Sequence, residues 1–264
     1  MPNGVTKSSF GALLVDSLPS LHVWPEGTLV FPLHKYPAPA EPGELFGAAE
    51  ESDQQSFNIG QVVLHDWSEI CGTEIAAEDA FYYCYGVLHS PIYRSRFEAD
   101  LKKQIPRVPA PRSQETFALF ADAGRALGDM HLNYESIEPY DQLKHEVSAG
   151  HSLDDPATLR VEKMRYGKTS GKVDKTTPAF NEAITITGIP ETTHSYRLGS
   201  RSALDWLVDR YAIRTDSKSS IVNDPNEWAT EVGDPRYILD LVGRIVEVSV
   251  RTVTIMEDLP DPMA

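Results

Sequence analysis

Between Ile75 and His131 apolar residues recur at the spacing of an α-helix, in three successive segments. Ser90 and Pro91 separate the first segment from the second, because serine accepts hydrogen bonds from a helix N-terminus and proline fits the first helical position. The proline-rich stretch 105–112 ends the second segment, and Ser113 is a suitable N-cap for the third. Three amphipathic segments in a row must bury their apolar faces, so the pattern predicts a helical region.

The second half of the chain changes to shorter segments with β-branched residues. Leu159–Tyr166 and Ala183–Thr187 are predicted as strands, the second because apolar and polar residues alternate cleanly. Ser202 is expected to cap a short helix. A longer helix is expected after Pro235, and a strand over 246–250 is the alternative for part of it.

These patterns predict a mixed α+β fold. A helical N-terminal part is followed by a mixed part with a small sheet and a C-terminal helix. A short edge strand, interrupted by Pro32, is expected over 28–36, and an acidic loop over 37–56. The predicted divisions are a linker, edge strand and acidic loop over 1–74, a helical part over 75–150 and a mixed recognition part over 151–264, with one continuous domain over 28–258 as the alternative.

The net charge of −15 is unevenly distributed. Residues 1–90 carry two basic residues against twelve acidic ones, whereas residues 91–220 carry nineteen against eighteen. Residues 160–175 hold six basic residues against two acidic ones and are the only strongly basic segment. An acidic chain of this kind does not coat nucleic acid or anionic membranes nonspecifically. Any contact with a polyanion is therefore expected in the middle of the chain.

Several catalytic motifs are missing from the sequence. It contains no G-x-G, no G-x-S-x-G, no H-E-x-x-H and no Pro-Pro pair, and the string Gly167-Lys168-Thr169 lacks the upstream glycine of a phosphate-binding loop. Two cysteines exclude a disulfide framework and a four-cysteine zinc site. We therefore predict no catalytic residue, no metal site and no cofactor. No apolar run approaches the length of a membrane span, and the N-terminus lacks the layout of a signal peptide, so a cytoplasmic protein without membrane contact is expected.

Several long strings, in a fixed order, resemble one protein family. They are EDAFYYCYGVLHSPIYRSRFEADLKKQIPRVP, LGDMHLNYE, KVDKTTPAFNEAITITGIP, YRLGSRSALDWLVDRYAIRTD and IVNDPNEW. Together they are similar to the C-terminal specificity region of type ISP restriction-modification enzymes and large adenine-N6 DNA methyltransferases, over roughly residues 12–258. Two local departures are Ser220, where a glycine is expected in a turn, and the atypical segment 192–195.

The resemblance implies a DNA target-recognition module. Its partners would be double-stranded DNA and the methyltransferase and nuclease/translocase modules of the same enzyme, which carry the catalytic motifs missing here. Basic side chains bind phosphates, and arginine also reads guanine in the major groove. The predicted DNA-binding residues are Lys163, Arg165, Lys168, Lys172, Lys175, Arg197 and Arg214.

Alternatives remain open for each part of this interpretation. The basic segment would equally suit a solvated, hairpin-like loop, and Arg197 and Arg214 would equally suit structural roles. The acidic N-terminal third would suit a protein-interaction module that does not touch DNA. Strings shared by enzymes with different target sites are expected to be scaffold, which predicts structural roles for Arg201, Asp205, Trp206 and Arg210, with Trp206 largely buried, and a turn at Asn223, Asp224 and Asn226.

Overall fold

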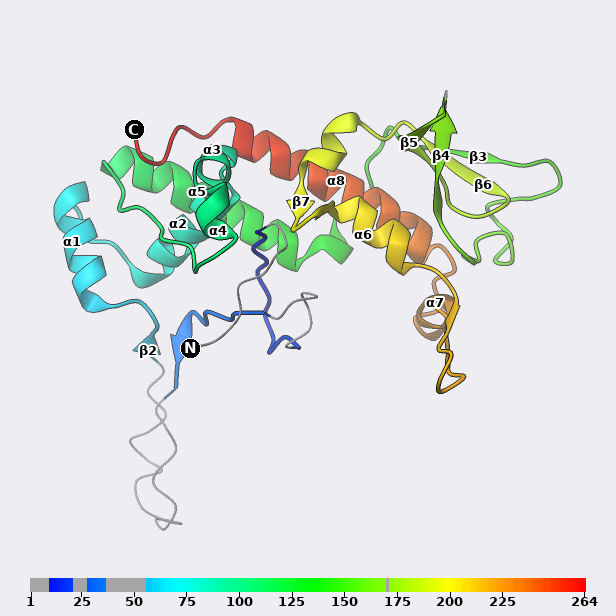
Figure 1. The fold of residues 1–264 in the computed structure, drawn as a ribbon, viewed down its shortest axis with the longest axis horizontal. Helices are drawn as coiled ribbons and strands as arrows, with labels where there is room; N and C mark the ends of the chain where they lie inside the picture. The colour runs from blue at the N-terminus through cyan, green and yellow to red at the C-terminus, as the bar shows by residue number, and fades with distance from the viewer. Residues whose placement is uncertain (1–9, 21–27, 37–55, 170) are drawn as a thin grey trace, which may run out of the picture. The chain divides into compact units, whose positions relative to one another are not determined.

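The computed structural model describes residues 10–20, 28–36, 56–169 and 171–264 (Figure 1). The chain divides into two compact units, which are described separately. Unit 1 comprises Met1–Asp129 and Asp258–Ala264, and unit 2 comprises Met130–Glu257. Helices and small antiparallel sheets occur together, which confirms the predicted α+β class. Within the described ranges, no helix is long and apolar enough to cross a membrane.

Unit 1 is mainly helical. A pair of two-residue strands, β1 (His34–Lys35) and β2 (Ser56–Phe57), precedes the helices. The helices are α1 (Gln61–Cys71), α2 (Ala77–His89), α3 (Pro91–Arg96), α4 (Glu98–Leu101) and α5 (Gln114–Leu132), the last of which continues into unit 2. The predicted caps are confirmed: the Ser90 hydroxyl accepts from the Tyr93 amide at 3.3 Å, and the Ser113 hydroxyl accepts from the Thr116 amide at 3.1 Å.

Two glycines let α2 and α5 approach closely. A Cβ on Gly124 would lie 1.9 Å from the carbonyl oxygen of Tyr82, and one on Gly86 would lie 2.3 Å from the carbonyl oxygen of Phe120. Both distances are too short for any side chain, so the two backbones meet directly. The helical spacing of Gly124 on the apolar stripe of α5 therefore marks a contact between helix backbones.

Aromatic rings fill the core of unit 1. Tyr83 stacks on Phe117 with centroids 5.3 Å apart and meets Trp67 edge-on at 5.1 Å. The Tyr83 hydroxyl donates to the carbonyl of Pro109 at 3.1 Å, and the Tyr93 hydroxyl donates to the carbonyl of Arg107 at 3.0 Å. Two core tyrosines thus hold the proline-rich stretch, whose backbone has few donors of its own.

The C-terminal segment of the chain also belongs to unit 1. Leu259 packs against the unit 1 core. The guanidinium of Arg96 donates to both carboxylate oxygens of Asp261, at 3.1 and 2.5 Å.

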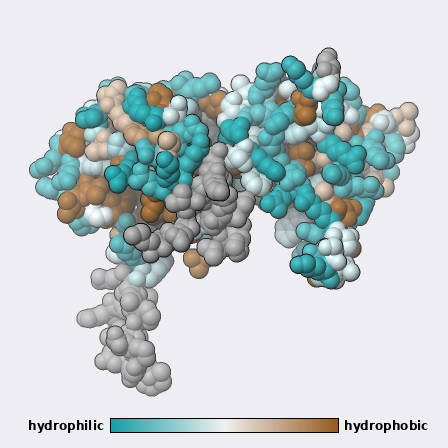
Figure 2. Space-filling view, in the orientation of Figure 1, coloured by the Kyte–Doolittle hydropathy of each residue, from teal (hydrophilic) through white to brown (hydrophobic). Residues whose placement is uncertain are grey.

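Apolar side chains remain exposed on the surface of unit 1, among them Val62 and Ile70 of α1. Brown residues are visible at the left of the space-filling view, where Figure 1 draws α1 (Figure 2).

Unit 2 is built on a four-stranded antiparallel sheet with the order β3-β6-β5-β4. Its strands are β3 (Lys144–Val147), β4 (Arg165–Thr169), β5 (Lys172–Ala179) and β6 (Ile184–Thr187). Two-residue strand pairs accompany it: β7 (Arg197–Leu198) with β8 (Arg201–Ser202), and β9 (Arg214–Thr215) with β10 (Val222–Asn223). The helical elements are η1 (Tyr134–Ser136), η2 (Glu191–Ser195), α6 (Ala203–Arg210), α7 (Asn226–Glu231) and α8 (Tyr237–Glu257).

Aliphatic side chains from the sheet and two helices form the core of unit 2. Ile184 and Ile186 of β6 are almost fully buried, as are Leu204 of α6 and Val242 of α8. The alternation predicted for 183–187 and the helix predicted after Pro235 are both confirmed, and the alternative strand over 246–250 is wrong because α8 is helical throughout. Burial of one α8 face, against η2 and α6 among other elements, outweighs its many β-branched residues.

The strand predicted over 159–166 is largely wrong, because only Arg165 and Tyr166 belong to β4. The side chain of Asn226 takes the place of a neighbouring strand at Val161. Its Oδ1 accepts from the Val161 amide and its Nδ2 donates to the Val161 carbonyl, both at 2.8 Å. A side-chain amide therefore satisfies the backbone that the alternating pattern assigned to a sheet.

Other predictions near the N-terminus need correction. The edge strand over 28–36 shortens to β1, which begins only after Pro32, whose nitrogen has no hydrogen to donate. The acidic loop predicted over 37–56 lies outside the described residues, apart from Ser56. Helix α1 was not predicted, although Leu64, Trp67 and Cys71 are spaced as one buried helical face.

The single helix predicted after Ser90 is interrupted at Phe97, which leaves helical geometry with φ −108° and ψ 18°. The predicted short helix after Ser202 is confirmed as α6. Ser202 and Asp205 form a reciprocal capping box at its N-terminus. Trp206 on this helix is partly buried, and its Nε1 donates to the carbonyl of Leu198 at 2.9 Å, which fits the structural role predicted for it.

Candidate nucleic-acid interface

The basic segment of unit 2 forms an antiparallel hairpin of two strands, in agreement with the hairpin-like shape considered from the sequence. Strands β4 and β5 pair from Arg165 opposite Ala179 to Thr169 opposite Lys172. Gly171 follows in the turn with φ +81°, a conformation that glycine adopts without strain. β5 pairs with β6 only through Ala179, so most of the hairpin extends beyond the sheet as a two-stranded ribbon (Figure 1). We call residues 165–179 the basic ribbon.

A bulge interrupts the basic ribbon where it leaves the sheet. Tyr166 lies opposite Pro178, but Gly167 lies opposite Asp174, so residues 175–177 have no partner in β4. The Asp174 carboxylate accepts from the amide of Thr176 at 2.9 Å and from the hydroxyls of Thr176 and Thr177 at 2.7 and 2.9 Å. Bulges bend a strand and redirect its side chains, and the Asp174 carboxylate contacts two successive residues of this one.

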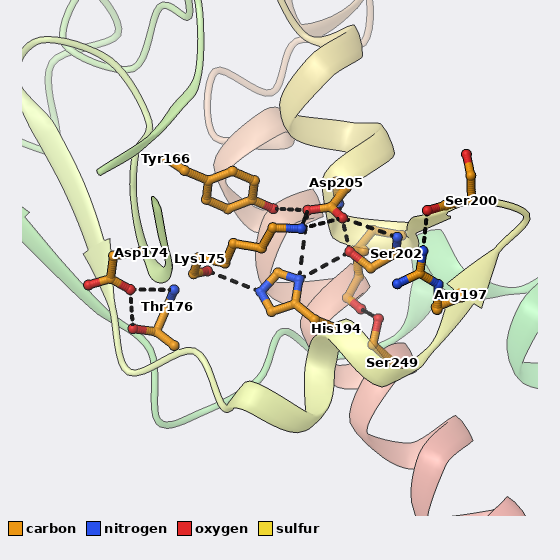
Figure 3. A network of polar contacts seen from close by, with 11 residues as sticks. Tyr166, Asp174, Lys175, Thr176, His194, Arg197, Ser200, Ser202, Asp205 and Ser249 are labelled. Atoms are coloured by element: carbon orange, nitrogen blue, oxygen red, sulfur yellow. Dashed lines mark hydrogen bonds and ion pairs between the residues drawn. The ribbon is translucent and has the colours of Figure 1, made fainter. Parts of the chain in front are cut away.

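Asp205 of α6 lies at the centre of a polar network beside the bulge (Figure 3). Its Oδ1 accepts from the Tyr166 hydroxyl at 2.9 Å, and Lys175 Nζ lies 2.9 and 2.8 Å from its two carboxylate oxygens. The Lys175 ammonium also lies 5.6 Å from the centre of the Tyr166 ring, within cation–π range. One residue from each strand of the ribbon therefore converges on the same helical carboxylate. We call Tyr166, Lys175 and Asp205 the ribbon anchor.

His194 of η2 links the ribbon anchor to the cap of α6. Its Nε2 lies 3.1 Å from the carbonyl oxygen of Lys175, and its Nδ1 lies 3.1 Å from the hydroxyl of Ser202 (Figure 3). A carbonyl only accepts, so Nε2 carries a hydrogen in this arrangement. The Nδ1 atom lies 3.8 Å from Asp205 Oδ1. Three segments distant in sequence thus share one network.

The anchor perturbs the pKa of its members. Burial raises the pKa of the Tyr166 hydroxyl well above its usual range, and the adjacent negative charge of Asp205 raises it further. Burial opposes ionisation of Asp205, but hydrogen bonds from Lys175, Tyr166 and the Ser202 amide outweigh it, so the pKa of Asp205 is lowered. Asp205 is therefore a carboxylate at neutral pH, paired with the ammonium of Lys175.

Four of the seven predicted DNA-binding residues have free, exposed side chains. Within the described ranges, no ion pair or hydrogen bond engages the side chains of Lys163, Arg165, Lys168 and Lys172. Lys168 and Lys172 lie beyond the bulge, toward the tip of the ribbon, whereas Lys163 precedes it and its backbone bridges to Ala212. The arrangement gathers four unneutralised positive charges on and beside one projecting element, which suits contact with a polyanion.

The other three predicted residues contact groups of the same unit. Lys175 belongs to the ribbon anchor. The Arg197 guanidinium donates to the carbonyl of Ser200, and that of Arg214 donates to the carbonyl of Asp209 and lies 3.5 Å from its carboxylate. Arg214 also lies outside the ribbon, in β9. The structure thus places four of the seven residues on the basic ribbon and Lys163 just before it, whereas Arg197 and Arg214 lie on other strands.

The residues predicted as scaffold make contacts that the sequence did not indicate. Arg201 pairs with Asp209 at 2.9 Å, eight residues away, and Arg201 and Arg210 both lie over the Trp206 indole, at 5.1 and 5.4 Å. Asp205 makes no such local pair and binds Lys175 instead, thirty residues away. Spacing within a helix carries no signal for that contact.

The turn predicted at Asn223, Asp224 and Asn226 is confirmed. Asp224 Oδ1 accepts from the Asn226 amide at 2.9 Å, and its other carboxylate oxygen pairs with Arg160. Arg160 therefore has a partner within unit 2, although it contributes to the basic count of the segment. In the part of the chain that the structure describes, no group of three potential metal ligands is found.

Comparison with protein families gives one match over nearly the whole chain. The model of the type ISP C-terminal specificity domain matches residues 2–241. No curated protein sequence matches the chain.

Three solved structures are similar to the chain over nearly all of its length. A nuclease-deletion mutant of the type ISP restriction-modification enzyme LlaGI, in complex with a DNA substrate mimic, shares 33% identity over 97% of this chain, with a TM-score of 0.72. The ATP-dependent type ISP enzyme LlaBIII bound to DNA shares 29% over 97%, with a TM-score of 0.77. A DrdV–DNA complex shares 28% over 98%, with a TM-score of 0.78. The chain spans only 20%, 16% and 24% of those three chains.

Proposed function

Because the chain belongs to the family of type ISP C-terminal specificity domains, we propose that it is the DNA target-recognition module of a type ISP-like restriction-modification system. The family model describes a specificity part rather than a catalytic one. The similar structures of LlaGI, LlaBIII and DrdV are complexes with DNA or a DNA mimic, and the present chain matches a part of each. These matches support double-stranded DNA as the ligand.

The basic ribbon is the observation that carries the proposal for this chain. In a chain of net charge −15, it gathers exposed cations on an element that projects from its sheet. A two-stranded β-ribbon fits the major groove of B-DNA, where base edges are distinguishable. We propose that Lys163, Arg165, Lys168 and Lys172 contact DNA, chiefly its phosphates. Contact by Lys175, Arg197 and Arg214 stays a prediction, since each of them already has a partner in unit 2.

The chemistry of the system would reside in other modules. The chain spans 16–24% of the similar enzymes, so we propose that an adenine-N6 methyltransferase and a nuclease/translocase are carried elsewhere. The chain would position DNA for them. A cytoplasmic location follows from this proposal, because the substrate would be intracellular DNA.

Binding of random-sequence duplex DNA, measured by fluorescence anisotropy at several low salt concentrations, tests the proposal. Replacing Lys168 and Lys172 together by Ala should weaken binding and reduce the slope of log K against log salt by about two, one per lost phosphate contact. Lys103→Ala with Lys218→Ala is the matched control. It removes two exposed lysines, one from unit 1 and one from the turn between β9 and β10.

Three outcomes separate the candidate functions. Weaker binding and a lower slope in the ribbon variant alone support DNA contact by the ribbon. Equal losses in both double variants would move the DNA contact away from the ribbon. Absence of binding by the unaltered chain at the lowest salt would contradict autonomous DNA recognition and favour a protein-interaction module.

A further inference from the structure

The ribbon anchor lies at the point where the basic ribbon leaves the sheet. Below the bulge, Arg165 and Tyr166 pair with Ala179 and Pro178. Above it, the ribbon has pairing only between its own two strands. The direction of the tip is therefore set at the bulge, where Tyr166 and Lys175 both contact Asp205 (Figure 3).

We propose that Asp205 and Lys175 are positioning residues, which fix the ribbon in the orientation that presents Lys168 and Lys172 to DNA. This inference rests on the proposed function. Asp205 is well placed for the role because its own backbone position is fixed. It sits in the first turn of α6, its amide donates to the Ser202 hydroxyl at 3.1 Å, and its carboxylate accepts from the Ser202 amide at 3.2 Å.

Lys175 differs from Lys168 and Lys172, the cations nearer the tip, because its charge is paired with a carboxylate. Lys175 Nζ lies within hydrogen-bond distance of both oxygens of Asp205, so an approaching phosphate meets a neutralised pair. The backbone carbonyl of Lys175 also accepts from His194. Lys175 is thus held at both its backbone and its ammonium, whereas Lys168 and Lys172 have no side-chain partner among the described residues.

Fixing the ribbon beforehand should strengthen binding without adding a DNA contact. A ribbon that swivels must be ordered when it binds, and ordering side chains and loops at an interface costs free energy. Removing the anchor should therefore lower DNA affinity roughly three- to tenfold. The number of phosphates neutralised should stay the same, so the salt slope should not change.

Salt titrations of single variants distinguish an anchor from a phosphate contact. Asp205→Asn, Lys175→Met and Tyr166→Phe should each weaken binding with an unchanged slope, and Asp205→Asn combined with Lys175→Met should be no weaker than either alone. Lys168→Ala should lower the slope by about one. A drop of that size in Lys175→Met would make Lys175 a phosphate contact and overturn the proposal.

Asp240→Asn is the matched control for Asp205→Asn. Asp240 is also an acidic residue of unit 2 in an ion pair, with Arg236 at 3.3 Å, so both changes remove one negative charge that repels DNA. The control should bind DNA as well as the unaltered chain or slightly better. Equal binding by both variants would contradict a positioning role for Asp205.

Hydrogen exchange of backbone amides tests the anchor without DNA. Asp205→Asn and Tyr166→Phe should accelerate exchange at residues 167–173, with unchanged exchange in α8 and an unchanged melting temperature within a few degrees. Unchanged exchange in the ribbon would overturn the inference even if DNA binding is confirmed. Faster exchange in a chain that does not bind DNA would keep the anchor and reject the proposed function.

Discussion

Unit 1 and unit 2 are stabilised by contacts of different range along the chain. In unit 1, the hydroxyls of Tyr83 and Tyr93 donate hydrogen bonds to carbonyls only 26 and 14 residues away. Helix α2 packs on α5, the third helix after it. In unit 2, Asn226 binds the backbone of Val161, 65 residues away. Regular periodicity therefore builds the helical body of unit 1, which its C-terminal segment joins through Leu259 and Asp261, whereas unit 2 depends on single polar side chains that join distant segments.

The largest effect is expected where the backbones of α2 and α5 touch. Gly124→Ala would place a Cβ 1.9 Å from the Tyr82 carbonyl, so the helices must separate, and the free energy of unfolding should fall by about 3 kcal/mol or more. Urea denaturation followed by circular dichroism measures this loss. Gly60→Ala, where a Cβ meets nothing within 4 Å, should change stability by less than about 0.5 kcal/mol. An unchanged free energy of unfolding in Gly124→Ala would mean that the stability of unit 1 does not depend on this contact.

Removing the side chain of Asn226 should lower the free energy of unfolding of unit 2 by a similar amount. Asn226→Ala leaves the amide and carbonyl of buried Val161 without partners, which should cost about 2–3 kcal/mol. Asn223→Ala, at an exposed position in the same turn, is the control and should cost under about 0.5 kcal/mol. If both variants unfold at the same urea concentration, long-range polar contacts are not what distinguishes unit 2.

A smaller, pH-dependent effect is expected at the ribbon anchor. The pKa of Asp205 is lower in the folded chain than its ordinary value of 3.8, so its contribution to stability is present above that value and disappears as the pH falls through the folded pKa. The stability difference between the unaltered chain and Asp205→Asn should thus stay constant from about pH 7 to about pH 5 and shrink as the pH falls below about 4. Urea denaturation across this range measures it, and a constant difference would show that the charge of Asp205 does not stabilise unit 2.

The smallest effect concerns the turn between β9 and β10, and its sign is opposite. Ser220 has φ +59°, a left-handed conformation that glycine adopts more readily. Ser220→Gly should raise the free energy of unfolding by about 0.5–1 kcal/mol, and with it the melting temperature. Ser219→Gly should lower it, because the Ser219 hydroxyl donates to Asp216 at 2.9 Å. Destabilisation by Ser220→Gly would contradict the view that this turn is locally strained.

In both units, what could be predicted from the sequence depended on how far apart along the chain the contacting residues lie. Ser90, Ser113 and Ser202 were identified as caps because capping depends on neighbours three residues away. The helix starting after Pro235 and the strand ending at Thr187 were found from periodicity for the same reason. Local patterns contain the information that local structure needs.

The long-range polar contacts of unit 2 could not be predicted from the sequence. Val161 looked like a strand residue because nothing nearby shows that Asn226 will satisfy its backbone. The basic segment was located correctly by its charge, but its bulge and its contact with Asp205 depend on side chains that meet only after folding. Charge counting also overstated the number of free cations, since Arg160 and Lys175 are neutralised by Asp224 and Asp205.

The return of Asp258–Ala264 to unit 1 makes unit 2 an insertion within unit 1. A ribosome therefore completes unit 2 before it delivers Leu259 and Asp261, the residues that finish the first unit. For the same reason, anyone transplanting unit 2 into a related protein must make two joins, after Asp129 and after Glu257, and both fall at helices. Recombination in nature would face the same requirement, because a single crossover after Asp129 would exchange unit 2 whole but would also replace residues 258–264, the C-terminal part of unit 1.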